Sequence, residues 1–317
     1  MLKTRYSRIA AVVFAACAVT ACSSGGSSDD IAAIKGSGTL SLSLVDAPIQ
    51  DAAEIWIRIK NISLKPAGAG PAIDFPIDPP LEVNLLSLTP DSAATLLDGV
   101  KVPAGSYDWL AMDVDAEFDG VTNDSYVTTQ AGGMEELRVP SGRLRLVSGL
   151  TITADQATSF MIDWNARMGL VHPPGQQGYM LRPAFRVVDM TLYGTVSGKV
   201  AAATIQSSAC LADNPNDANA GNVVYVYAGT GVTPDDIDGT DPEPVATVNV
   251  EQNAAGDYVY KTLLSPGTYT LAFTCQAGND DPDTDDTDTD PATADKVVFS
   301  SPVNVNLAAD AAEAADF

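Results

Sequence analysis

Cys22 is the residue whose type and position suggest the clearest chemistry in this sequence. It follows the small residues Thr20 and Ala21, and a basic segment (residues 3–8) and an apolar run (residues 9–19) precede it. This order is typical of a bacterial lipoprotein signal. We therefore predict that residues 1–21 are removed as a signal peptide and that Cys22 receives acyl chains such as palmitate on its sulfur and its amine. Two or more acyl chains hold a protein on a membrane far better than one.

The alternatives for this segment are a transmembrane helix and an ordinary secretory signal. The apolar run is about half of the roughly 20 residues that a spanning helix needs, and Cys17 is a poorer acceptor because Phe14 occupies its minus-three position. Residues 22–36, rich in Ser, Gly and Asp, have the composition of a flexible lipidated linker. Ser23 and Ser24 favour the outer membrane, by analogy with enterobacterial sorting.

Two further cysteines suggest a disulfide. The chain has four cysteines, and Cys210 and Cys275 remain once Cys17 and Cys22 are assigned to the N-terminal segment. Disulfides persist in the envelope, so we predict that these two are paired. The chain-entropy model assigns about 4 kcal/mol to closing such a loop. A zinc site is the alternative, but His172 is distant in sequence and no second ligand pair has metal-binding spacing.

A dense run of aspartates could bind a hard cation. The acidic stretch 278–295 is of low complexity, and we assign it to a loop without a fixed shape. Its carboxylates suit weak calcium binding at millimolar concentration, and a solvated run of charge is the alternative. A second acidic set, over residues 113–119, is interpreted as the solvated face of a strand. The candidate ligands in the first run are Asp281, Asp283, Asp285, Asp286 and Asp288.

The sequence offers little for catalysis. A hydrolytic triad needs a base beside a Ser or Cys, and the single histidine, His172, stands in a loop beside Pro173 and Pro174. Glycosidases need two carboxylates, and with 41 acidic residues such pairs are uninformative. Phosphate-loop, His-Glu-x-x-His and nucleophile-elbow motifs do not occur. We therefore expect no catalytic residue and no enzymatic activity.

The elements expected to position these residues are β-strands. Leu40, Leu42 and Leu44 alternate with polar residues, as do Ile55 and Ile57, which is the pattern of half-buried strands. A short helix is expected only over residues 91–98. This spacing predicts antiparallel sandwich or barrel architecture. Further strands are expected at 110–118, 144–147, 160–162 and 181–187.

A second all-β block begins near residue 191. Both blocks contain a similar turn, at 102–107 and at 264–269, in which Pro presets one dihedral angle and Gly supplies a positive one. We predict two antiparallel β-sandwich domains of Ig-like or transthyretin-like form, over residues 37–190 and 191–307, followed by a tail over 308–317 that frays or forms a helical turn. The strands expected in the second block lie at 194–200, 223–227, 245–250, 258–262, 268–275 and 297–305.

Charge limits the possible partners. Three of the 17 basic residues lie in the signal, which leaves 14 against 41 acidic residues and a formal charge near -27. Such a chain is repelled by nucleic acid and by anionic headgroups. Cations and neutral ligands such as glycans remain compatible with it, and solubility or adaptation to salty surroundings explains the charge better than a specific cation site does.

The first block resembles a known family. The opening 38–48, with Val-Asp-Ala-Pro at its end, the stretch 162–164 (Ile-Asp-Trp) and the closing 179–183 (Tyr-Met-Leu-Arg-Pro) are similar to domain of unknown function family 4382, found in bacterial envelope lipoproteins. The resemblance covers residues 36–190 and implies an envelope location, but no activity. Over residues 191–307 the second block resembles carboxypeptidase-regulatory or transthyretin-like sandwiches.

A tethered chain without a catalytic set is typical of a display module. We therefore expect a non-catalytic envelope lipoprotein that binds a glycan or another envelope protein; a purely structural component and a hydrolase are the alternatives. Trp56 and Trp109 share the parity of charged residues, so we expect them on the outer face unless a second sheet covers it.

Overall fold

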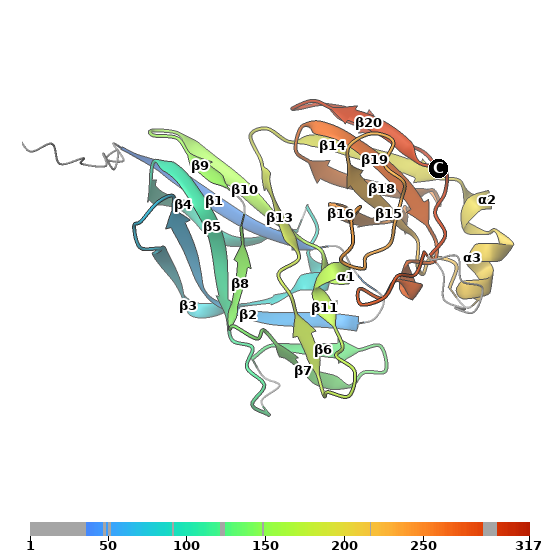
Figure 1. The fold of residues 1–317 in the computed structure, drawn as a ribbon, viewed down its shortest axis with the longest axis horizontal. Coiled ribbons are helices and arrows are strands. Elements are labelled where there is room, and N and C mark those ends of the chain that lie inside the picture. Colours follow the sequence, from blue (N-terminus) through green and yellow to red (C-terminus); the bar gives the residue numbers. More distant parts are fainter. Residues whose placement is uncertain are drawn as a thin grey trace, which may run out of the picture. The chain divides into compact units, whose positions relative to one another are not determined.

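The computed structural model describes most of the chain after the predicted linker. The described residues are 36–46, 49, 52–90, 92–120, 124–147, 149–215, 217–287 and 297–317. Cys22 and the predicted signal lie outside them. Among these residues, no helix combines the length and hydropathy needed to cross a membrane. The chain is all-β, as the alternating pattern predicts (Figure 1).

Two sheets built from residues 37–189 form the first sandwich. The four-stranded sheet has the order β13-β10-β1-β4, and the nine-stranded sheet has the order β11-β12-β7-β6-β2-β5-β8, with β3 also on β2 and β9 also on β5. The pairings are antiparallel except for β1 with β10 and β7 with β12, which are parallel. The strands are β1 (Ser37–Asp46), β2 (Ala52–Pro66), β3 (Ile73–Asn84), β4 (Ala94–Pro103), β5 (Gly105–Val114), β6 (Tyr126–Thr129), β7 (Met134–Arg138), β8 (Arg143–Leu146), β9 (Leu150–Ile152), β10 (Ala157–Trp164), β11 (Leu170–Val171), β12 (Tyr179–Leu181) and β13 (Phe185–Asp189).

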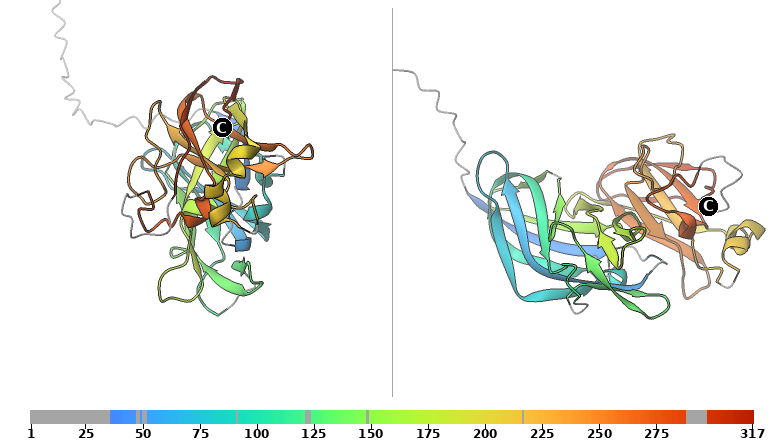
Figure 2. Two further views of the ribbon diagram at one scale, coloured as in Figure 1. Left: turned by 90° about the vertical axis from the view of Figure 1, so that its right-hand side faces the viewer. Right: turned by 60° about the horizontal axis from the view of Figure 1, so that its bottom comes forward.

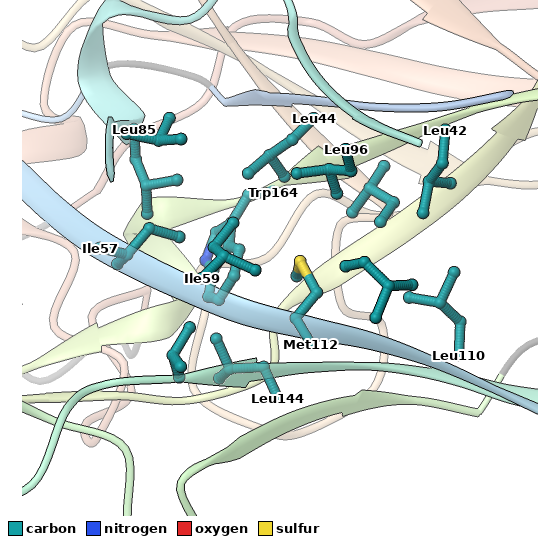
Figure 3. Packing of buried hydrophobic residues seen from close by; sticks show 14 of the residues in the cluster. Leu42, Leu44, Ile57, Ile59, Leu85, Leu96, Leu110, Met112, Leu144 and Trp164 are labelled. Atoms are coloured by element: carbon teal, nitrogen blue, oxygen red, sulfur yellow. The ribbon is translucent and has the colours of Figure 1, made fainter. Parts of the chain in front are cut away.

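The core of this sandwich lies between its two sheets. Leu42 and Leu44 of β1 point into the core from one sheet, and Ile57 and Ile59 of β2 with Met112 of β5 lie across from them (Figure 3). The side-chain period of a strand is two, so alternate apolar residues reach one face together. Each fully buried side chain of this kind contributes about 1.5–3 kcal/mol through the hydrophobic effect.

Two four-stranded sheets form the second sandwich, whose layers can be followed in Figure 2. Their orders are β17-β18-β14-β21 and β16-β15-β19-β20, and all pairings are antiparallel except β14 with β21. A separate apolar cluster, which includes Val196, Val224 and Phe273, fills the space between them. The strands are β14 (Gly194–Val200), β15 (Val223–Ala228), β16 (Ala246–Asn249), β17 (Glu251–Gln252), β18 (Tyr258–Leu264), β19 (Gly267–Thr274), β20 (Val303–Leu307) and β21 (Ala312–Ala314).

The described helices are short, with three to six residues each. Asn165 caps the first α-helix by accepting a hydrogen bond from the Met168 backbone N–H, and Ser207 caps the third by accepting one from Cys210. Such short helices depend on their packing for stability. They are η1 (Leu85–Ser87), α1 (Ala166–Gly169), α2 (Ala202–Ile205), α3 (Ser208–Asp213) and η2 (Ala277–Asn279).

Several sequence expectations about local structure are wrong. The range 181–187, expected as one strand, is divided between β12 and β13, which belong to different sheets. Residues 94–98, expected in a helix, begin strand β4 because they pair with β1. Strand β5 ends at Val114 instead of continuing to 118, and the next backbone N–H, of Asp115, donates to the carbonyl of Arg58. The C-terminal tail contains a short strand, β21, which pairs with β14, and the Phe317 N–H donates to the carbonyl of Lys199. In each case hydrogen bonds to distant strands override the local signal.

The two sandwiches contact each other through the outer face of the four-stranded sheet of the first sandwich, β13-β10-β1-β4. Val45, Met161 and Val188 are buried on that face and pack against Leu263 of β18. Beside them the Arg186 guanidinium Nη2 donates to Thr262 Oγ1 at 3.3 Å. Strands β1, β10 and β13 are therefore covered on both faces.

Candidate functional site

Cys210 and Cys275 form the predicted disulfide. Their Cα atoms are 5.4 Å apart, and both residues are buried. The bridge joins helix α3 to the residue directly after β19, and Asn214 Nδ2 donates to the Cys275 carbonyl at 2.9 Å. It holds the start of the acidic stretch against the second sandwich.

Asp113 of β5 and Asp115, directly after β5, have basic partners on the outer face of the nine-stranded sheet. Asp113 Oδ2 accepts from Arg143 Nη2 at 3.0 Å, and Asp115 Oδ1 accepts from Lys60 Nζ at 2.8 Å. Burial alone would raise the pKa of Asp113, but the hydrogen bonds from Arg143 and Asn61 hold it below its ordinary value. Of the acidic residues predicted to share one strand face over 113–119, only Asp113 lies in β5, and Glu117 and Asp119 are exposed after the strand has ended.

The aromatic side chains on the same outer face are half-buried. Trp56 stacks on Tyr126 with ring centroids 6.2 Å apart, and the Arg145 guanidinium carbon lies 4.6 Å from the centre of the Trp109 ring. Neighbouring residues of the same sheet thus cover both tryptophans in part, which leaves the face charged and polar instead of openly aromatic.

Of the four predicted metal ligands that the structure describes, two lie near other carboxylates and two do not. Asp281 and Asp283 are exposed, and Asp283 Oδ1 lies 3.2 Å from Arg182 Nη1. Asp288 lies outside the described residues. Asp285 and Asp286 approach other carboxylates that sequence reasoning missed.

We define the carboxylate cluster as Asp235, Asp236, Asp280, Asp285 and Asp286. One oxygen from each of Asp235, Asp236 and Asp285 lies within 4.8 Å of the other two, and the same holds for Asp236, Asp280 and Asp286. Asp236 thus belongs to both triads. The adjacent acidic residues 235 and 236 were the available signal in the sequence for this cluster. Asp236 and Asp280 are 44 positions apart, so the sequence did not indicate that they meet.

The hydrogen bonds around Asp280 hold its buried carboxylate against β15, on the face opposite to the core between the two sheets. Its Oδ2 accepts from the Tyr225 hydroxyl, and its Oδ1 accepts from the Ile237 N–H at 3.2 Å. Burial raises the pKa of Asp280 to about 7, and burial also raises that of Asp236.

A cavity of about 400 Å³ lies where the two sandwiches meet. Val45, Met161 and Val188 from the first sandwich and Leu263 from the second give it an apolar lining. Its polar lining includes Asp163, Asn249, Glu251, Lys261 and Thr262. The uninterrupted apolar run 160–162 was a signal for a strand buried on both faces, although only its alternate residues were assigned to the core.

The single histidine has surroundings typical of the surface. His172 is exposed, its Nε2 lies 3.9 Å from Glu135 Oε2, and its ring meets Tyr179 edge-on. No described Ser or Cys forms a hydrogen bond with it. The described residues thus offer no nucleophile–base pair at His172.

Comparisons with known proteins identify part of the chain. Residues 37–183 match the family model described as domain of unknown function (DUF4382). A search of curated proteins finds no match. Similar solved structures include a protein proposed to be an adhesin from Bacteroides ovatus ATCC 8483 (11% identity, 90% of this chain and 88% of that chain, TM-score 0.19) and the major pilin of Streptococcus pyogenes (10% identity, 89% and 99%, TM-score 0.16). With TM-scores this low, these likenesses assign no function to the chain.

Proposed function

We propose that the protein, whose residues 37–183 match the DUF4382 family model, is a lipid-anchored envelope protein that binds a neutral glycan without catalysing a reaction. The lipoprotein signal and Cys22 support the anchor, and Ser23 and Ser24 support the outer membrane as its location. The cavity at the meeting of the two sandwiches is the observation that carries the binding proposal.

The size and lining of the cavity suit a small part of a glycan. A volume of about 400 Å³ falls in the range of pockets that enclose small ligands. Asn249, Lys261 and Thr262 offer hydrogen-bond donors, while Asp163 and Glu251 offer acceptors. Sugar hydroxyls both donate and accept, and the apolar lining fits the C–H face of a sugar ring. The strongly acidic chain favours a neutral glycan over an anionic one.

A glycan panel tests this proposal. The purified full chain, solubilised in detergent, is expected to retain specific neutral glycans and to lose them in Lys261→Ala and in Val259→Trp, which fills the cavity. Lys199→Ala removes an exposed lysine outside the cavity and serves as the matched control. Absence of binding to every glycan, or equal binding by the cavity variants, would contradict the proposal. Turnover of a glycan in a hydrolysis screen would replace it with the hydrolase alternative.

A further inference from the structure

The carboxylate cluster combines proximity with burial in a way that an exposed acidic loop does not. Asp236 has 0% of its surface exposed and Asp280 has 7%. Asp235 and Asp236 follow β15, whereas Asp280, Asp285 and Asp286 follow β19. Because these neighbouring strands are antiparallel, the two segments leave opposite ends of the sheet and meet again near Tyr225, which hydrogen bonds to Asp280. A buried carboxylate is costly unless it is paired or coordinates a metal.

Asp236 is the member with an unused oxygen. Its Oδ2 accepts a hydrogen bond from the Asp286 N–H at 2.7 Å, whereas its Oδ1 is buried and has no hydrogen-bond partner. The residue that carries this unpartnered Oδ1, Asp236, is also the residue that the two triads share. A buried acceptor without a donor is unfavourable and indicates a missing ligand or proton.

Positive charge from the protein does not neutralise the two most buried members. Among the described residues, no Lys or Arg forms an ion pair with Asp236 or Asp280. Arg167 is buried nearby and acts on Asp280 through its charge, but its Nη1 donates to the carbonyl of Ala277. The negative charge of the cluster is therefore available to bind a divalent cation.

The geometry favours calcium over magnesium. Two oxygens bound to one calcium ion lie at most about 4.8 Å apart, twice a bond of about 2.4 Å, and each triad meets this limit. Calcium accepts 6–8 oxygens in irregular arrangements, whereas magnesium requires a near-ideal octahedron and gives up its water reluctantly. The five carboxylates come from two loops and share no regular spacing.

We propose that the carboxylate cluster is a calcium site centred on Asp236, and that the bound ion ties residues 280–287 to the segment after β15. Asp235 and Asp285 complete the ligand set from the more exposed side, while Asp236 and Asp280 hold it from the buried side. The site is independent of the anchor and of glycan binding, so either proposal can fail alone.

Calorimetric titration of the metal alone into the chelator-treated full chain is the first test. We expect one calcium ion per chain, bound at least about tenfold more tightly than magnesium, together with a higher melting temperature and slower proteolysis within 280–287. Equal effects of calcium, magnesium and sodium at one ionic strength would overturn the proposal. Terbium offers a second readout, because Tyr225 donates to Asp280 and would sensitise its luminescence.

Matched variants decide which carboxylates bind the ion. Asp236→Asn and Asp285→Asn are each expected to weaken calcium binding at least about tenfold, whereas Asp283→Asn, in the same loop but in neither triad, should not. Asp285 is exposed, so its variant carries the test if Asp236→Asn does not fold. Unchanged affinity in Asp285→Asn, or a loss confined to Asp283→Asn, would refute this ligand set.

Discussion

Tyr107 and Tyr269 hold equivalent positions in the two sandwiches. The Tyr107 hydroxyl donates to the Pro103 carbonyl at 2.6 Å, and the Tyr269 hydroxyl donates to the Ser265 carbonyl at 2.8 Å. In both cases the acceptor is four residues earlier, across the turn that the two blocks share in sequence. This is the geometry of a tyrosine corner, which locks the entry of a strand in β-sandwich proteins.

Removing either hydroxyl should destabilise its own sandwich. Tyr107→Phe and Tyr269→Phe each lose one hydrogen bond, with an expected cost of about 1 kcal/mol in the free energy of unfolding. All three tryptophans, Trp56, Trp109 and Trp164, lie in the first sandwich, so urea unfolding followed by tryptophan fluorescence reports on that sandwich. The fluorescence midpoint should fall for Tyr107→Phe. If both variants shift it equally, the corners do not act locally.

The Cys210–Cys275 bridge should stabilise the second sandwich in particular. The two cysteines are 65 positions apart in sequence. The double variant Cys210→Ala with Cys275→Ala is therefore expected to lose about 4 kcal/mol in the free energy of unfolding, the chain-entropy value for a loop of this length. Circular dichroism should record the early loss of β-structure while tryptophan fluorescence changes later. A single coincident transition, shifted for both probes, would instead indicate that the two sandwiches unfold as one unit.

Cys22 should be needed for membrane attachment. Cys22→Ala is expected to leave an unprocessed precursor that does not incorporate labelled palmitate, because the acceptor thiol is absent. Cys17→Ala is the matched control and should be processed and labelled normally. Palmitate labelling and detergent extraction of Cys22→Ala that match the native protein would contradict the lipoprotein assignment.

The Asp113 carboxylate should make the free energy of unfolding depend on pH under acidic conditions. Its pKa in the folded state is lowered, so its contribution is present above the unfolded value near 3.9 and is lost as pH falls through the folded value. Asp113→Asn should therefore be less stable than the native protein at pH 7, by about 1 kcal/mol or less, and the difference should shrink below pH 4. Asp108→Asn, at an exposed position of the same strand, is the control for urea unfolding. A difference that stays constant from pH 7 to pH 3 would argue against this role of the ion pair.

The sequence by itself determined the strand pattern and the disulfide pairing. Alternation at Leu40–Leu44 and Ile55–Ile59 was sufficient because a strand exposes its two faces with a period of two, so local residues report which side is buried. Cys210 and Cys275 were assigned by elimination and oxidising chemistry, which require no coordinates. The same local signals failed at 94–98 and at the C-terminal tail, where partners distant in sequence supply the hydrogen bonds.

Tertiary structure alone decided where the acidic residues meet and where a cavity forms. From composition, the aspartates of 281–288 formed one candidate set, yet the fold leaves Asp281 and Asp283 exposed and places Asp285 and Asp286 beside Asp235 and Asp236. The burial and charge environment of these carboxylates depend on the packing of β15 and β19, which are adjacent in space but distant in the chain. Local sequence encodes which residues can ligate an ion, whereas the distances between their oxygens arise only when the strands that carry them pair.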